Sequence, residues 1–311
     1  MIANRIPPWT YGFWAAALML GVIGFQSGIG SIGPTLTVAL AFGAISVLVG
    51  TGQMFVIASG PGNLDLSVPS VLTLAAYVSM TMMDRTGGMI SVGIVAALAV
   101  GAVAGCLNYT AIRFLRLPPI IATLAWSFIF QSFAFNLGGQ ATLKPPQALS
   151  DFTTLRLGSV QVMPLTIIIL SVVAALFLAF TVWGRNLLAT GQNERAAHFA
   201  GVRVGPVRLV AYVICGMTAA MAGVVLSGFT GGAALNMGNT YLMESIAIVA
   251  LGGTSVAGGQ ANAIGIWGAA LFFNLMGTML NIFQADAGVR FVLMGILIVL
   301  IVAIVPRPEA R

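Results

Sequence analysis

The chain has 311 residues, of which 59% are hydrophobic and 6% are charged, and its mean hydropathy is +1.03. A soluble domain carries about 25% charged residues, so these charges are too few to cover a water-facing surface and predict a polytopic membrane protein. The net charge of +6 does not indicate nucleic-acid binding, because the arginines fall in short loops between apolar runs. Cys106 and Cys215 lie inside apolar runs, which disfavours a disulfide framework.

Apolar runs of membrane-span length follow one another along the chain. A helix needs about 20 residues to cross a hydrocarbon core of about 30 Å, and about ten runs approach that length. They lie at Tyr11–Ser27, Pro34–Ile57, Ser67–Met83, Ile90–Ile112, Ile120–Leu137, Val162–Trp183, Val207–Gly228, Tyr241–Val256, Ala261–Phe283 and Gly288–Val305. The first run has no convincing cleavage site, so we expect a retained span. The predicted fold class is therefore all-α, a single transmembrane domain over residues 1–311.

The basic residues indicate the orientation of the chain. If Arg5 is cytoplasmic, an even number of about ten spans returns the C-terminus to the cytoplasm as well. The loops with Arg113 and Arg116, and with Arg185 to Arg208, then face the same side. The longest outer loop, Gly138–Gln161, contains Pro145 and Pro146 and is expected to be an extended crossover without helix.

One polar segment, residues 184–206, interrupts the apolar pattern on the expected cytoplasmic side. Asn193 is suited to cap a short helix, Glu194 falls in its first turn, and Gly201 lies just past its end. The helix would have about seven residues and a length of roughly 10 Å, with Ala196, Phe199 and Ala200 on one face. A helix this short is not stable alone, so it needs a partner.

The residues for catalysis or energy coupling are missing. The single lysine, Lys144, is not preceded by glycine, so no phosphate-binding P-loop can form. The single histidine, His198, has no ligand cluster around it, which disfavours a metal site or a hydrolase. Ionisable residues near the spans are few (Asp65, Glu244, Asp286 and Arg290), which disfavours an ion-driven carrier. The remaining interpretation is an uncharged pathway through the membrane that takes its energy from outside this chain.

Two glycine-rich stretches break the apolar pattern. In residues 60–70, Ser67 is suited to cap the following span and Pro69 fits its first turn, while Asn63 and Asp65 can bind freed amides. The second stretch covers residues 251–260. Broken helices at membrane depth are tolerated where they are buried in protein or line a cavity. Each stretch is therefore either part of a passage or its gate, or a plain turn.

Four segments carry a resemblance to a known family. They are Gly62-Asn63-Leu-Asp65-Leu-Ser67-Val, Asn108 with Arg116-Leu-Pro-Pro-Ile-Ile-Ala-Thr123-Leu, Gly191-Gln-Asn193-Glu194-Arg-Ala196-Ala197-His-Phe199-Ala-Gly201-Val, and Leu251-Gly-Gly253-Thr254-Ser255-Val-Ala-Gly258-Gly259. In this order they resemble motifs of ribose-type sugar permeases of bacterial ATP-binding cassette (ABC) importers, in the branched-chain amino acid/sugar permease superfamily. The chain departs from the family pattern where Asn63 and Pro69 replace glycine and Ala200 replaces serine.

The resemblance implies a non-enzymatic importer subunit of the bacterial inner membrane. It would work with cytoplasmic ATPases that hold ATP and Mg²⁺, a periplasmic sugar-binding protein and a second permease subunit. The ATPase-coupling residues would be Gly191, Asn193, Glu194, Ala196, Ala197, Phe199 and Gly201. The pathway or gate residues would be Asn63, Asp65, Ser67, Asn108, Thr123, Gly253, Thr254 and Ser255. The chain itself would bind no cofactor, metal or nucleic acid.

Alternatives remain open at this stage. A permease for branched-chain amino acids or nucleosides has the same architecture, and a strongly apolar, aromatic pathway would favour it. An ATP-independent channel would conduct without ATPase subunits. An intramembrane enzyme or assembly subunit is disfavoured by the missing clusters of ionisable residues.

Overall fold

The computed structural model describes residues 7–138, 143–158 and 160–284, together with single positions up to residue 296. The long helices are α1 (Tyr11–Ser27), α2 (Ile32–Ala58), α3 (Val68–Arg85), α4 (Ile90–Phe114), α5 (Pro119–Gly138), α7 (Val162–Phe180), α10 (Val204–Thr230) and α12 (Ala263–Ile282). The shorter helices are α6 (Gln147–Thr154), α8 (Val182–Gln192), α9 (Glu194–Phe199) and α11 (Tyr241–Leu251). Two-residue strands β1 (Arg156–Leu157) and β2 (Val160–Gln161) pair antiparallel.

The expected all-α class is confirmed, whereas the expected number of about ten spans is not. Six helices of the described residues are long and apolar enough to cross a membrane: α2, α4, α5, α7, α10 and α12. The apolar helices α1 and α11 are shorter than a full span. Helix α1 matches its predicted bounds. Most of the tenth predicted run, Gly288–Val305, lies outside the described residues.

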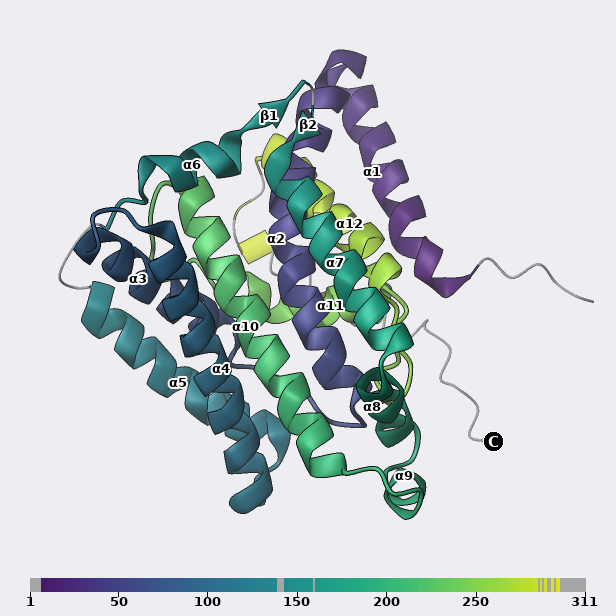
Figure 1. The fold of residues 1–311 in the computed structure, drawn as a ribbon. Helices are drawn as coiled ribbons and strands as arrows, with labels where there is room; N and C mark the ends of the chain where they lie inside the picture. The colour runs from purple at the N-terminus through teal and green to yellow at the C-terminus, as the bar shows by residue number, and fades with distance from the viewer. Residues whose placement is uncertain are drawn as a thin grey trace, which may run out of the picture.

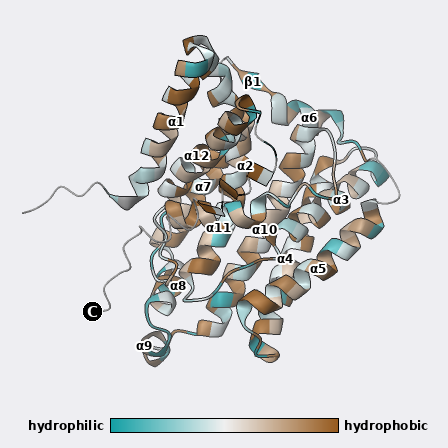
Figure 2. Cartoon of the chain, turned by 180° about the vertical axis from the view of Figure 1, so that it is seen from behind, coloured by the Kyte–Doolittle hydropathy of each residue, from teal (hydrophilic) through white to brown (hydrophobic). Residues whose placement is uncertain are grey.

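Two features mark opposite ends of the molecule. Helix α6 and the β1–β2 pair lie at one end, and α8 and α9 lie at the other (Figure 1). Hydrophilic residues concentrate around these ends, while hydrophobic ones line the helices between them (Figure 2). This distribution is the one that a membrane protein requires, because charged groups are expensive in the hydrocarbon core.

The break between α2 and α3 and the segment before α11 meet inside the molecule. A Cβ placed on Gly238, in the segment that enters α11, would collide with the carbonyl of Pro69 in the first turn of α3. From this point α3 runs toward the α6 end, where Gly88 approaches Pro146. Helix α11 runs the other way, toward the α9 end. The N-termini of two helices of opposite direction therefore approach each other in the interior.

Helices α4 and α10 touch backbone to backbone. A Cβ on Gly105 would fall 2.6 Å from the Cα of Val213, and one on Gly101 would fall 2.8 Å from the Cα of Met217. Gly216 of α10 packs in the same way against Gly101. Small residues let membrane helices approach this closely and gain van der Waals contact. These glycines therefore serve the close packing of α4 on α10.

The outer loop differs from the prediction. Pro145 and Pro146 were expected to keep the whole crossover free of helix, but α6 begins at Gln147, directly after Pro146. Proline opposes helix where its ring would meet a preceding turn, whereas just before the first turn it obstructs nothing. Leu149 and Thr153 of α6 are buried against the end of α10 at Gly228.

The α4–α10 contact gives a first prediction. Gly105→Ala places a methyl group against backbone that cannot move away, and we expect a loss of stability of about 1–3 kcal/mol. Gly277→Ala in α12 is the matched control, because no described residue has an atom within 4 Å of its Cβ position. That change is expected to be neutral or slightly stabilising, since alanine favours helix. Thermal unfolding of the detergent-purified chain measures both, and equal midpoints would contradict the proposed contact.

Candidate functional site

Helix α9 forms as the sequence indicates. It has six residues, one fewer than expected, and the side-chain oxygen of Asn193 accepts a hydrogen bond of 3.0 Å from the Ala196 N–H. Gly201 has a φ of 85°, and the Val202 N–H returns to the Ala197 carbonyl at 3.0 Å. The helix is thus capped at both ends, which holds a short segment in one shape.

The apolar face of α9 points away from the rest of the molecule. Phe199 is 88% exposed, and Ala196 and Ala200 are exposed beside it. Ala197 is buried and anchors the opposite face. A large aromatic side chain presented to solvent on a rigid helix marks a contact surface for another protein.

An ion pair ties α9 to α10. The carboxylate of Glu194 lies 2.8 Å from the Arg208 guanidinium, whose Nε also donates to the Ser59 carbonyl at 3.3 Å. Arg208 thereby connects α9, α10 and the end of α2. The sequence did not identify Arg208 as the partner of Glu194, because fourteen positions separate the two residues and no helical spacing links them.

Two of the four sequence segments meet the end of α2 at the last residues of α8. The Gly259 N–H donates to the Ala58 carbonyl at 2.9 Å, and the Gln192 side chain donates to the Gly259 carbonyl at 3.2 Å. Gly191 leaves no room for a Cβ, because the Ala58 carbonyl and the backbone of Gly259 occupy that place. Gly191 is therefore a packing position at the foot of α8, and its coupling role stays a prediction.

Four residues expected near the passage form one buried polar cluster. Asp65 accepts hydrogen bonds from the Ser67 hydroxyl at 2.6 Å and the Ser67 N–H at 2.9 Å. The Asn108 amide donates to the Ser67 hydroxyl at 2.7 Å and to both Asp65 oxygens at 3.3 Å. Thr123 accepts from the Leu66 N–H at 3.1 Å. Together they bind amides that the break exposes ahead of α3.

The capping arrangement differs from the expected one in one respect. Ser67 is the N-cap residue of α3, but its side chain makes no capping bond to that helix. Asp65 binds the Ser67 amide instead, which also places a negative charge at the positive end of α3. Asn63 is buried near Gly60 and lines a cleft beside α9.

The second break contains Gly253, Thr254 and Ser255. Gly253 has a φ of 85° and packs on Trp9, while the buried Thr254 hydroxyl accepts from the Asn262 N–H at 3.2 Å. The buried Ser255 hydroxyl has no hydrogen-bond partner among the residues that the structure describes. These contacts shape the turn between α11 and α12, and the gating role of the three residues stays a prediction.

A second buried carboxylate was noted in the sequence, but its partners were not. Glu244 in the first turn of α11 accepts from Ser46 of α2 at 2.6 Å and from Asn274 of α12 at 3.3 Å. Asn274 also donates to Ser46 at 3.2 Å. Ser46 and Asn274 are polar residues inside apolar runs, and this is the signal that could have identified them.

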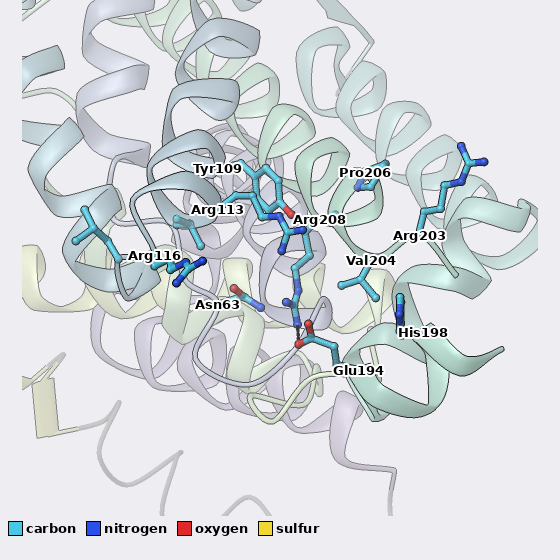
Figure 3. A pocket seen from close by; sticks show the side chains of 13 residues that line it. Asn63, Tyr109, Arg113, Arg116, Glu194, His198, Arg203, Val204, Pro206 and Arg208 are labelled. Carbon is cyan, nitrogen blue, oxygen red and sulfur yellow. Dashed lines mark hydrogen bonds and ion pairs between the residues drawn. The ribbon is translucent and has the colours of Figure 1, made fainter. Parts of the chain in front are cut away.

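Beside α9 lies a cleft of about 650 Å³, bounded by the end of α4 and the start of α10. Arg113, Arg116 and Arg208 extend into this region, and the Glu194–Arg208 pair closes one side (Figure 3). Among the residues that the structure describes, no three His, Cys, Asp or Glu side chains gather to hold a metal ion.

Comparison with known proteins decides the family. The family model described as "Branched-chain amino acid transport system / permease component" matches residues 35–302. The chain belongs to this permease family. With six helices of span length among its described residues, the permease is a multi-pass protein of the inner membrane.

Several relatives of the permease are named as import proteins. An autoinducer 2 import system permease protein of Photorhabdus laumondii is 32% identical over 79% of this chain and 75% of its own length. A fructose import permease protein of Rhizobium meliloti is 29% identical over 87% and 77%. A galactose/methyl galactoside import permease protein of Haemophilus influenzae is 29% identical over 94% and 92%. No solved structure matches the permease.

The buried cluster gives the second prediction. Asp65→Ala leaves the Ser67 N–H and hydroxyl without their acceptor and removes the contacts of Asn108 with Asp65. We therefore expect the free energy of unfolding to fall by about 2–4 kcal/mol. Asp84→Ala, near the exposed end of α3, is the matched control and should change it by less than about 0.5 kcal/mol. Thermal unfolding in one detergent compares them. If the Asp65→Ala protein is as stable as the control, Asp65 does not anchor α3.

Proposed function

We propose that the permease is the translocation subunit of an importer that moves a neutral monosaccharide, or a similar small solute, into the cytoplasm. Separate ATPase subunits would bind ATP and Mg²⁺ and dock on α9. The observation that carries this proposal is the capped α9 helix with Phe199 88% exposed, in a chain of a transport permease family. A short amphipathic helix of this kind fits a groove on a partner.

The other partners follow from the same arrangement. The α9 end would face the cytoplasm, as the basic loops indicate, and both termini would lie on that side. The α6 end would then receive solute from a periplasmic binding protein. A second permease subunit, identical or related, would complete the pathway between the two chains.

The buried charges favour a neutral solute. The Asp65 carboxylate is held by Ser67 and Asn108, and an oxygen of the Glu244 carboxylate is held by Ser46 and Asn274. Each is therefore engaged by the protein itself and supports a helix N-terminus. The names of the three relatives, two of which refer to sugars, favour a sugar over the branched-chain amino acid alternative.

The docking proposal gives the third prediction. Phe199→Ala removes the exposed ring without disturbing either cap of α9, so the protein should insert normally and lose at least about 2 kcal/mol of ATPase affinity. Uptake of solute in cells that express the complete importer should fall accordingly. The matched control is Phe180→Ala, which alters an equally large, 75% exposed ring at the end of α7. Co-purification of the ATPase with both variants measures the effect. If the Phe199 variant retains the ATPase as well as the control does, α9 is not the docking helix.

The energy source gives the fourth prediction. In proteoliposomes, the permease with its ATPase subunits and binding protein should accumulate a monosaccharide only when ATP is present. The permease alone should show no flux, because the pathway of an importer opens only when the ATPases drive it. Flux without ATPase subunits would identify a channel. ATP-driven accumulation of leucine but not of any monosaccharide would identify the branched-chain amino acid alternative.

A further inference from the structure

The cleft beside α9 gathers arginines from distant parts of the chain. Arg113 belongs to the last turn of α4, Arg116 follows that helix, and Arg208 lies in α10. In Figure 3 the side chains of Arg113 and Arg116 stand on one side of the cleft and Arg208 occupies its centre. Basic loops that set topology need only lie on one side of the membrane. Convergence on one cleft goes beyond that requirement.

Two of these arginines, Arg113 and Arg116, have no acidic partner within 4.0 Å in the described part of the chain. Glu194 is the only carboxylate among the residues that line the cleft, and Arg208 engages it at 2.8 Å. Within the described part of the chain this is the only ion pair closer than 4.0 Å. The side chains of Arg113 and Arg116 are exposed. Two guanidinium groups without a carboxylate form a site for an anion, and their planar forks match phosphate oxygens.

The N-terminal end of α10 adds to the positive electrostatic potential in the cleft. Val204, Gly205 and Pro206 form the first turn of α10 and line the cleft. This helix has 27 residues, and its N-cap residue, Arg203, provides no side-chain acceptor for the first amides. The positive end of a helix favours a negative charge nearby. The arginines and this helix end therefore select the same kind of ligand.

We propose that this cleft binds the phosphate group of a ligand that reaches the α9 face of the permease. That group belongs either to a phosphorylated small solute or to the headgroup of an anionic lipid. A phosphate bound by Arg113 and Arg116 also attracts Arg208 and competes with Glu194 for it. Occupancy thus loosens the tie between α9 and α10. The effect of this loosening on ATPase coupling rests on the proposed function, whereas binding itself does not.

Binding is tested on the full chain in phosphatidylcholine nanodiscs, without ATPase subunits, by titration with inorganic phosphate and phosphorus NMR line widths. The Arg113→Gln/Arg116→Gln double variant should raise the apparent Kd about tenfold, which corresponds to about 1.4 kcal/mol. Arg185→Gln, in α8 outside the cleft, is the matched control and should stay within about twofold of the unaltered chain. Glu194→Gln frees Arg208 and should lower the Kd about threefold. A gain in affinity cannot arise from misfolding.

A second arm distinguishes the two sources of phosphate. The chain is exchanged into mixed phosphatidylglycerol and phosphatidylcholine, and native mass spectrometry counts the lipids retained. If the ligand is a lipid headgroup, the unaltered chain and Arg185→Gln retain phosphatidylglycerol, and the double variant loses it. If the ligand is a soluble phosphate, the three proteins retain lipid equally and differ only in the titration. A double variant that matches the unaltered chain in both arms overturns the proposal. Loss of transport in the experiments above leaves this binding result unaffected.

Discussion

Backbone amides and carbonyls buried away from water must find hydrogen-bond partners, and an uninterrupted transmembrane helix provides them within itself. In this permease the helical path is interrupted ahead of α3 and ahead of α11. Ahead of α3, the Asp65 carboxylate and Thr123 hydroxyl take amides that a continuous helix would have satisfied itself. Asn108 of α4 then fixes Asp65 and Ser67. The position of α3 depends on this cluster, because Ser67 has no capping bond of its own.

The segment that enters α11 is stabilised in the same way, with different residues. Helix α11 carries a buried glutamate in its first turn, as α3 is preceded by a buried aspartate. Each carboxylate accepts a hydrogen bond from a neutral side chain of another helix, Ser46 of α2 for Glu244 and Asn108 of α4 for Asp65. The two helix starts approach at Pro69 and Gly238, and the helices leave in opposite directions. Paired breaks of opposite sense in the interior are typical of transport proteins, whose solute sites lie between such helix ends.

Hydropathy and capping residues were sufficient to predict much of this structure. The bounds of α1 and the caps of α9 follow from local signals, namely an apolar run in one case and Asn193 with Gly201 in the other. The Glu194–Arg208 pair and the partners of Glu244 depend on how remote helices pack, which no local pattern encodes. Helix α6 was missed because proline was taken to exclude helix after it as well as before it.

The exposed ring of Phe199 also bears on the life of the protein before assembly. A subunit made without its partner displays an apolar side chain on a rigid helix next to the arginine-lined cleft. Chaperones and proteases bind exposed apolar surface of this kind on proteins that are incompletely folded or assembled. The same ring that marks a contact surface would therefore limit the number of unassembled subunits in the cell, and the abundance of the permease would follow the supply of its partner.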